Sequence, residues 1–162
     1  MAHDVRAVAN AILDLAARSQ RDVTNLALNK ILYFLHAGFL HAYGEPLISA
    51  KIEAWDHGPV FREIYHQFKR FGRSEITGRA VRLNPASGEF EQVHGAFSAS
   101  ETAFIHENGS RLLDLSPGKL VDMSHVRDGP WYVARFGGGT LNPGVEITDD
   151  LILAGGKAHA RH

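Results

Sequence analysis

The stretch from residue 23 to residue 68, VTNLALNKILYFLHAGFLHAYGEPLISAKIEAWDHGPVFREIYHQF, changes its hydrophobic period near its middle. Its first half begins near Asp22 or Thr24 and is apolar on almost every side, with one face formed by Leu28, Ile31, Leu32, Leu35 and Phe39. A helix that is apolar all round belongs in the interior of a protein. We therefore predict a buried central helix that is capped by Gly44 and cannot continue through Pro46.

The second half of this stretch alternates between apolar and polar residues from Ile48 to Asp56, the two-residue repeat of a half-buried strand. His57 and Gly58 then form a predicted turn. Pro59 suits the first turn of a following helix, where its missing N–H has no partner to lose, and Gly72 is expected to end that helix. The sequence EAWDHGPV is thus predicted to be a strand-turn-helix corner.

The rest of the chain adds helices and one hairpin around this corner. We predict helices from an Asp4 cap to the SQRD segment at 19–22, from the Ser98–Glu101 capping box towards Leu115, from Ser116-Pro117 to His125, and after Pro130-Trp131. Two short strands, 79–84 and 89–93, flank a PASG loop. A loop is expected over 136–144 and a last helical turn or two over 147–153.

These elements predict a mainly helical α+β single domain. A buried central helix packs against a small antiparallel sheet, which is formed by residues 48–56 and the 79–93 hairpin. The domain is expected to span residues 1–153, and residues 154–162, AGGKAHARH, are expected to be a flexible tail.

Composition excludes several classes of protein. The 162 residues carry a formal net charge of −1 and contain no cysteine, so neither disulfides nor thiolate metal sites are available. We see no signal peptide at the N-terminus and no run of about 18 apolar residues that would span a membrane, and we expect a cytoplasmic protein. The net charge gives no global reason to bind nucleic acid.

Charge is nevertheless uneven along the chain. Six basic and two acidic residues lie between Arg62 and Arg82, whereas five acidic residues face Arg111 alone between Pro85 and Asp114. These charges are either the solvent-exposed faces of a helix and a hairpin or a surface that binds a charged partner. The candidate basic contact surface consists of Arg62, Lys69, Arg70 and Arg73.

Motifs for catalysis are weak. The ten histidines are scattered, and His36 and His41, five residues apart, point about 140° apart on a helix, so they make a poor metal pair. HExxH, GxSxG and phosphate-binding glycine loops are absent. We predict no catalytic residue, metal or cofactor.

Polar and aromatic residues do stand where a core would favour aliphatic ones. Lys30 lies in the apolar central helix, and it either extends its ammonium to the surface or pairs internally with Glu53. Glu53 and Trp55 share one strand face. For His125 and Trp131 the simplest roles are structural, with each ring N–H satisfied by a buried acceptor.

An ordered set of these residues resembles the Panacea-domain family of SocA-type antitoxins and phage-associated GepA-like proteins. The family pattern TNLxLxKLLYF falls on residues 24–34, the G-x-PL step on 44–47, and EAWxxGPV on 53–60, followed by Tyr65. The later LVDMSHVRDGPWYVAR resembles the family's second hallmark at Ser124-His125 and Pro130-Trp131. Ile31 and His57 are small departures, and the resemblance extends over about residues 8–153.

The resemblance implies a non-enzymatic antitoxin that neutralises its cognate toxin by direct binding, with delivery of the toxin to an ATP-dependent protease of the ClpXP kind in some relatives. Candidate family-motif or partner-binding residues are Lys30, Tyr33, Glu53, Trp55, His57, Tyr65, His125 and Trp131. Two alternatives stay open. One is a DNA-binding regulator that uses the basic stretch 62–82, and the other is a small metal-dependent hydrolase centred on His57 and His125.

Overall fold

The computed structural model describes residues 2–137 and 145–159. Its helices are α1 (Val5–Arg18), α2 (Asn25–Tyr43), α3 (Arg62–Phe68), the 3-10 turn η1 (Lys69–Phe71), α4 (Ala99–Leu113), α5 (Pro117–Ser124), α6 (Pro130–Phe136) and α7 (Asp149–His159). Its strands are β1 (Glu53–Trp55), β2 (Gly58–Val60), β3 (Val81–Leu83), β4 (Phe90–Gln92) and β5 (Val145–Glu146). The predicted mainly helical α+β domain is confirmed.

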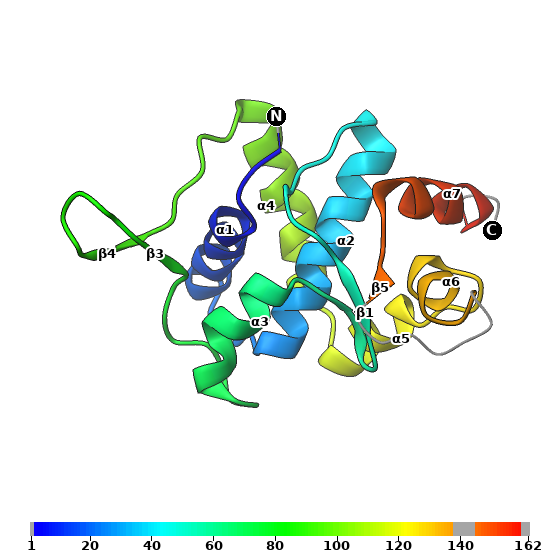
Figure 1. Cartoon of the computed structure of the whole chain (residues 1–162), viewed down its shortest axis with the longest axis horizontal. Helices are drawn as coiled ribbons and strands as arrows, with labels where there is room; N and C mark the ends of the chain where they lie inside the picture. The colour runs from blue at the N-terminus through cyan, green and yellow to red at the C-terminus, as the bar shows by residue number, and fades with distance from the viewer. Residues whose placement is uncertain (1, 138–144, 160–162) are drawn as a thin grey trace.

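Helix α2 is the central, buried helix that its sequence predicts. Thr24 caps it, with its hydroxyl accepting a hydrogen bond from the Ala27 amide at 3.2 Å, and Gly44 ends it in the left-handed conformation at φ 70°. Leu28, Leu32 and Leu35 are fully buried. In Figure 1, α2 runs through the middle of the molecule, and it contacts α1, α3, α4, α5, α7 and β2.

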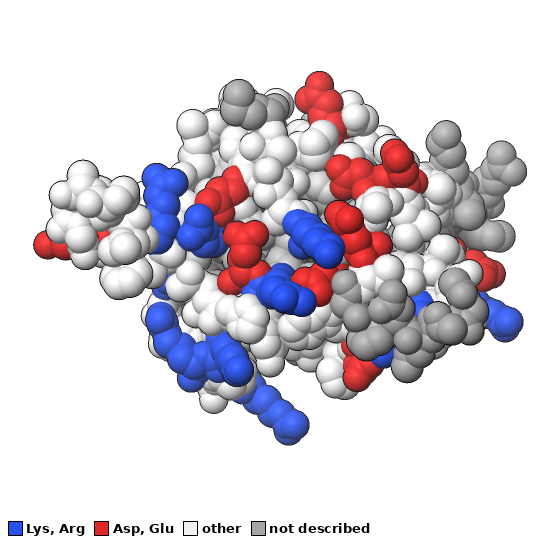
Figure 2. Space-filling model, in the orientation of Figure 1, with Lys and Arg blue, Asp and Glu red and all other residues white. Residues whose placement is uncertain are grey.

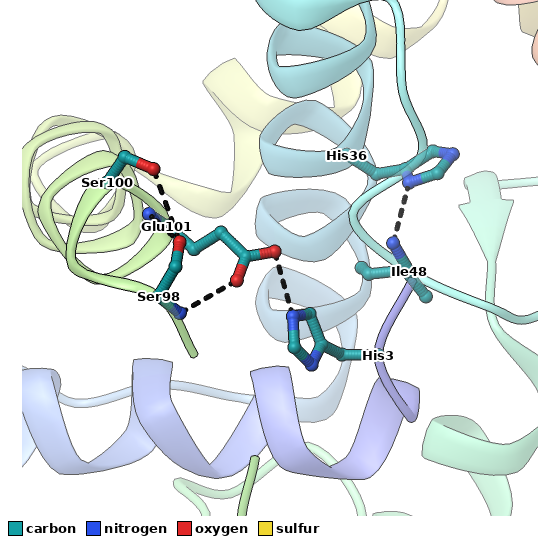
Figure 3. A network of polar contacts seen from close by, with 6 residues as sticks. All are labelled: His3, His36, Ile48, Ser98, Ser100 and Glu101. Carbon is teal, nitrogen blue, oxygen red and sulfur yellow. Dashed lines mark hydrogen bonds and ion pairs between the residues drawn. The ribbon is translucent and has the colours of Figure 1, made fainter. Parts of the chain in front are cut away.

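The N-terminal caps of α1 and α4 also follow the sequence. Asp4 accepts from the Arg6 amide at the start of α1, and Ser98 and Glu101 form the complete capping box of α4. The Glu101 carboxylate also lies 2.8 Å from Nε2 of His3, and the Nδ1 of His36 accepts from the Ile48 amide. Both contacts are drawn in Figure 3. None of the helices in the described residues is both long and apolar enough to cross a membrane.

The predicted strand at 48–56 is mostly wrong. Only Glu53–Trp55 is a strand, while Ile48 forms an isolated bridge with His3. The His3 amide donates to the Leu47 carbonyl and the Ser49 amide donates to the His3 carbonyl, each at 2.8 Å. His3 therefore occupies the backbone groups of Leu47 and Ser49, which in a longer strand would have paired with a neighbouring strand of the sheet.

The predicted helix start at Pro59 is also wrong. Pro59 lies in β2 opposite Ala54, and α3 begins three residues later, with Phe61 as its N-cap. β2 is the edge of the sheet of order β2-β1-β5, and an edge strand tolerates proline because its outer side has no ladder bond to lose. The corner is thus a tight β-hairpin with Asp56 and His57 in its turn, and Gly58, at φ 116°, is the first residue of β2.

The hairpin at 79–93 is confirmed but its predicted partner is not. β3 and β4 form a separate two-stranded sheet, which projects from the body in Figure 1. The third strand beside β1 is instead β5, which the sequence did not indicate. The predicted domain end at residue 153 lies inside helix α7, and the division of the chain at that residue stays a prediction. Most of the predicted loop at 136–144 lies outside the described residues.

Candidate functional site

The β1–β2 hairpin packs against α2, α5 and α6, and four of the eight candidate family-motif residues meet there. We call this group the joint cluster; it consists of Lys30, Trp55, Gly58, Pro59, Ser124, His125 and Trp131. These residues come from α2, β1, β2, α5 with its C-cap, and α6, and they are separated by up to about a hundred positions in the sequence. The fold brings them together by packing the hairpin across the middle of α2.

Lys30 lies at the centre of the joint cluster, with none of its surface exposed. Its ammonium donates a hydrogen bond to the Pro59 carbonyl at 3.1 Å. Burial lowers the pKa of Lys30 to about 7, because moving the charged form away from water is unfavourable. Both predictions for this residue, a side chain that reaches the surface and an ion pair with Glu53, are wrong.

Gly58 is fitted tightly against this lysine. A Cβ atom at Gly58 would lie 2.6 Å from the Ser124 hydroxyl oxygen and 2.7 Å from Cε of Lys30. Ser124 is itself buried, and its hydroxyl donates to the Val121 carbonyl at 2.8 Å. Glycine is needed here both for the positive φ and for the close approach of α2 and α5.

His125 and Trp131 close the other side of the joint cluster as a stacked pair. Their ring centroids are 3.8 Å apart with an interplanar angle of 16°, and the Trp131 indole N–H donates to the Trp55 carbonyl at 2.7 Å. The indole is therefore satisfied structurally, as predicted. The prediction for the His125 ring is wrong, because its Nε2 is buried without a hydrogen-bond partner among the described residues. Burial, followed by the nearby charges of Lys30 and His57, lowers the pKa of His125.

Two ion pairs hold the strand β1 from either side. The buried Glu53 carboxylate accepts two hydrogen bonds from Arg62, both at 2.9 Å, in the bidentate geometry that suits guanidinium. Arg135, 5% exposed, donates to the Ala54 carbonyl at 3.2 Å and pairs with Asp56. Arg62 is thereby committed to Glu53, and the sheet is fixed to both α3 and α6.

The remaining motif residues lie around the joint cluster. Trp55 packs edge-on against Tyr65 at a centroid distance of 4.9 Å, and His57 is exposed at the tip of the hairpin turn. Tyr33 is 4% exposed, and burial raises its pKa. It lines an apolar groove of about 310 Å³ between α2, α5, the start of α6 and α7, together with Phe34, Ala37 and Met123.

The basic residues of η1 and the turn after it lie elsewhere. Lys69, Arg70 and Arg73 are exposed at the far end of α3, where Arg70 packs over the Phe71 ring at 4.7 Å. Figure 2 shows lysine and arginine side chains gathered at this lower edge of the molecule, apart from the mixed charges at its centre. The candidate basic surface is thus a group of three, since Arg62 is paired.

Sequence reasoning missed Asn29, Asp56 and Arg135. The Asn29 side chain accepts from the Phe61 amide at 2.9 Å and donates to Asn25, so it fixes the entry to α3. Its signal was a second polar residue beside Lys30 in an apolar helix. For Arg135 the signal was weaker, an arginine at the end of the PWYVAR motif.

The geometry bears on the chemical alternatives. Within residues 2–137 and 145–159, no group of three or more His, Asp or Glu side chains gathers as a metal site. His36 uses Nδ1 to accept from Ile48 and places Nε2 2.8 Å from Asp149, so both nitrogens have structural partners. The joint cluster is a closed set of packing and hydrogen-bond contacts that fixes the hairpin to three helices.

Comparison with known proteins gives a consistent result. The model of the family Antitoxin SocA-like, Panacea domain matches residues 28–132, from α2 to α6, and so includes the whole joint cluster. The chain is also 40% identical over 154 residues to the protein named Antitoxin SocA from Caulobacter vibrioides, which covers 92% of this chain and 80% of that protein. No solved structure matches the chain.

Proposed function

Because the chain belongs to the Antitoxin SocA-like, Panacea domain family, we propose that it is an antitoxin that binds a cognate toxin and neutralises it by direct contact. The observation that carries this proposal is the 40% identity with an antitoxin across 92% of the chain. The similarity is not confined to one motif, so it supports a shared scaffold and a shared role. We propose that this role is non-enzymatic.

The burial of the motif residues supports a division between scaffold and contact surface. Lys30, Tyr33, Glu53 and Trp131 are each at most 6% exposed, so a partner could not reach them without opening the fold. Of the candidate residues, His57 has its side chain exposed in the hairpin turn. We therefore place the joint cluster in the scaffold, and the toxin contact on exposed residues outside it.

Co-expression tests the proposal. The product of the gene adjacent to this one is expressed alone and together with this protein, and growth and complex formation are measured. We expect growth arrest by the neighbour alone, rescue on co-expression, and co-purification of the two chains. A neighbour that is harmless alone, or toxic but not rescued, contradicts an antitoxin role. A variant with a bulky residue at Gly58 is the matched negative control, because it destroys the scaffold and leaves the surface composition unchanged.

The manner of neutralisation needs a second measurement. A blocking antitoxin leaves the toxin intact in a stable complex, whereas an adaptor to a ClpXP-type protease shortens the lifetime of the toxin. The half-life of the toxin in cells with and without that protease separates the two. Rescue that persists without the protease means that binding alone is sufficient.

A DNA-binding role is the second candidate, and the exposed trio Lys69, Arg70 and Arg73 is the observation in its favour. Retention on duplex DNA that falls with salt, and is lost on charge reversal at Arg70 and Arg73, would support it. Retention that is unaffected by these reversals would contradict it. The net charge of −1 makes it the weaker candidate.

A further inference from the structure

The β3–β4 hairpin carries the most exposed apolar pair that the structure describes. Leu83 and Phe90 lie directly opposite each other across the two strands, and they are 53% and 71% exposed. Residues directly opposite share one face of a sheet, so the two side chains form one continuous apolar surface. Arg82 and Glu91 occupy the opposite face of the hairpin. This apolar face has no partner among the described residues.

The base of the hairpin is fixed to the body by a buried polar clamp. Asn10 of α1 is 2% exposed and makes three hydrogen bonds there: its amide donates to the carbonyls of Ala80 and Val93, at 2.9 and 2.8 Å, and its oxygen accepts from the Ala80 amide at 2.7 Å. Arg79 adds an ion pair with Asp14 at 2.8 Å. A two-stranded hairpin is marginal by itself, and this clamp gives it a defined direction.

The tip of the hairpin is equally well formed. The Asn84 side chain accepts from the Ala86 amide at 2.9 Å and donates to Glu91 at 2.7 Å, and the Gly88 amide donates to the Asn84 carbonyl at 2.8 Å. Hydrogen bonds at both ends thus hold a protruding element whose apolar face points into solvent. Such a surface contributes nothing to the core, and exposed apolar surface of this kind marks interaction sites.

The charge around the pair indicates the chemistry of the partner. Glu89 lies next to Phe90 near the tip of the hairpin, whereas Glu91 lies on the opposite face, where it is in register with Arg82 and accepts from Asn84. No lysine or arginine occurs from Leu83 to Gln92. Figure 2 shows this protruding end with white and red side chains, and with blue only towards its base. A complementary surface would offer an apolar recess for Phe90 and Leu83 with basic side chains at its rim.

We propose that the Leu83–Phe90 face of the hairpin is the anchor by which this protein docks onto its toxin, in an apolar recess rimmed by lysine or arginine. This inference rests on the proposed antitoxin function and assigns it a surface. Aromatic side chains that fill a partner's pocket contribute most of the binding free energy at many interfaces. Phe90 is therefore the main anchor and Leu83 extends it.

The test measures the affinity of the adjacent gene's product for the purified full chain and its variants, by calorimetry or surface plasmon resonance. Phe90→Ala and Leu83→Ser are the test variants, and Leu26→Ser, at a 39% exposed leucine on α2, is the matched control. We expect binding at least about 30-fold weaker for Phe90→Ala and unchanged binding for the control. Thermal unfolding checks that each variant is folded.

A charge variant tests the basic rim separately. Glu89→Lys should slow association about tenfold at low salt and less at high salt, because the charges steer the encounter. A faster association would mean that the rim of the partner is acidic, which overturns the stated chemistry.

The other outcomes are distinct. If the wild-type chain binds and Phe90→Ala binds equally well, the docking inference is wrong and the antitoxin proposal stands. If the wild-type chain does not bind, both fail. If light scattering shows a wild-type dimer that Phe90→Ala dissociates without weakening toxin binding, the face is a contact between two copies, and the inference is likewise overturned.

Discussion

Replacing Lys30 by methionine should stabilise the protein at pH 6 and destabilise it at pH 10. At pH 6 the wild-type ammonium is charged in both the folded and the unfolded state, and it is fully buried in the folded one. The lowering of its pKa from the usual 10.5 to about 7 corresponds to a penalty of about 5 kcal/mol. Methionine removes that penalty and fills a similar volume.

The substitution also removes the donor to the Pro59 carbonyl. An unsatisfied buried acceptor costs about 1–3 kcal/mol. The net gain at pH 6 is therefore about 2–4 kcal/mol, which for a domain of this size raises the melting temperature by roughly 5–15 °C.

The pH dependence follows from the direction of the pKa change. Between about pH 7 and the unfolded-state pKa, the unfolded chain binds the proton and the folded chain does not, so wild-type stability rises with pH across this window. The burial penalty is present in full below pH 7 and has largely disappeared by pH 10. At pH 10 the variant has only lost a hydrogen bond and should be about 1–2 kcal/mol less stable than the wild type.

Urea unfolding at pH 6, 8 and 10 measures these differences. Lys119→Met, at an exposed lysine of α5, is the control and should change the free energy of unfolding by less than about 0.5 kcal/mol at each pH. If Lys30→Met destabilises the protein equally at pH 6 and pH 10, burial does not penalise the ammonium, and the reasoning is refuted.

Two further substitutions test the fit of the hairpin. Gly58→Ala should destabilise the protein by about 3 kcal/mol or more, because the new Cβ would lie under 3 Å from Ser124 and Lys30 and the residue has a positive φ. The control Gly88→Ala, at φ 72° with open space around it, should cost about 1 kcal/mol. Equal costs in urea unfolding would show that the close approach is not what requires glycine at residue 58. Arg62→Ala should cost about 2 kcal/mol, because the buried Glu53 carboxylate loses its bidentate partner, whereas Arg111→Ala at an exposed pair should cost less than about 0.5 kcal/mol; a similar effect of the two on melting temperature would mean that the Glu53 pair acts as an ordinary surface contact.

The sequence predicted which residues belong to the candidate site better than it predicted how they contact one another. Lys30, Trp55, His125 and Trp131 were all singled out as polar or aromatic residues in unusual places, and the structure brings them together. Their pairings were not predictable, because Lys30 could reach either Glu53 or the Pro59 carbonyl, and only the register of the hairpin decides between them. The ion pair of Arg135 with Asp56 joins residues 79 positions apart, a separation at which the local pattern carries no information.

The sequence by itself determined most of the helices, because their capping signals are local, although it placed the start of α3 three residues too early. Thr24 and Gly44 bound α2, Ser98 and Glu101 start α4, and each cap is completed by hydrogen bonds to residues within four positions. The all-round apolar pattern of α2 also determined that it is central. The tertiary structure decided how the strands pair. β1 joins β2 and β5 rather than the 79–93 hairpin, because the alternation of apolar and polar residues around this short strand is compatible with many partners. It also decided that EAWDHGPV is a hairpin fixed by a buried lysine, because Pro59 suits an edge strand as well as a helix start, and only the packing against Lys30 and Ser124 selects the strand.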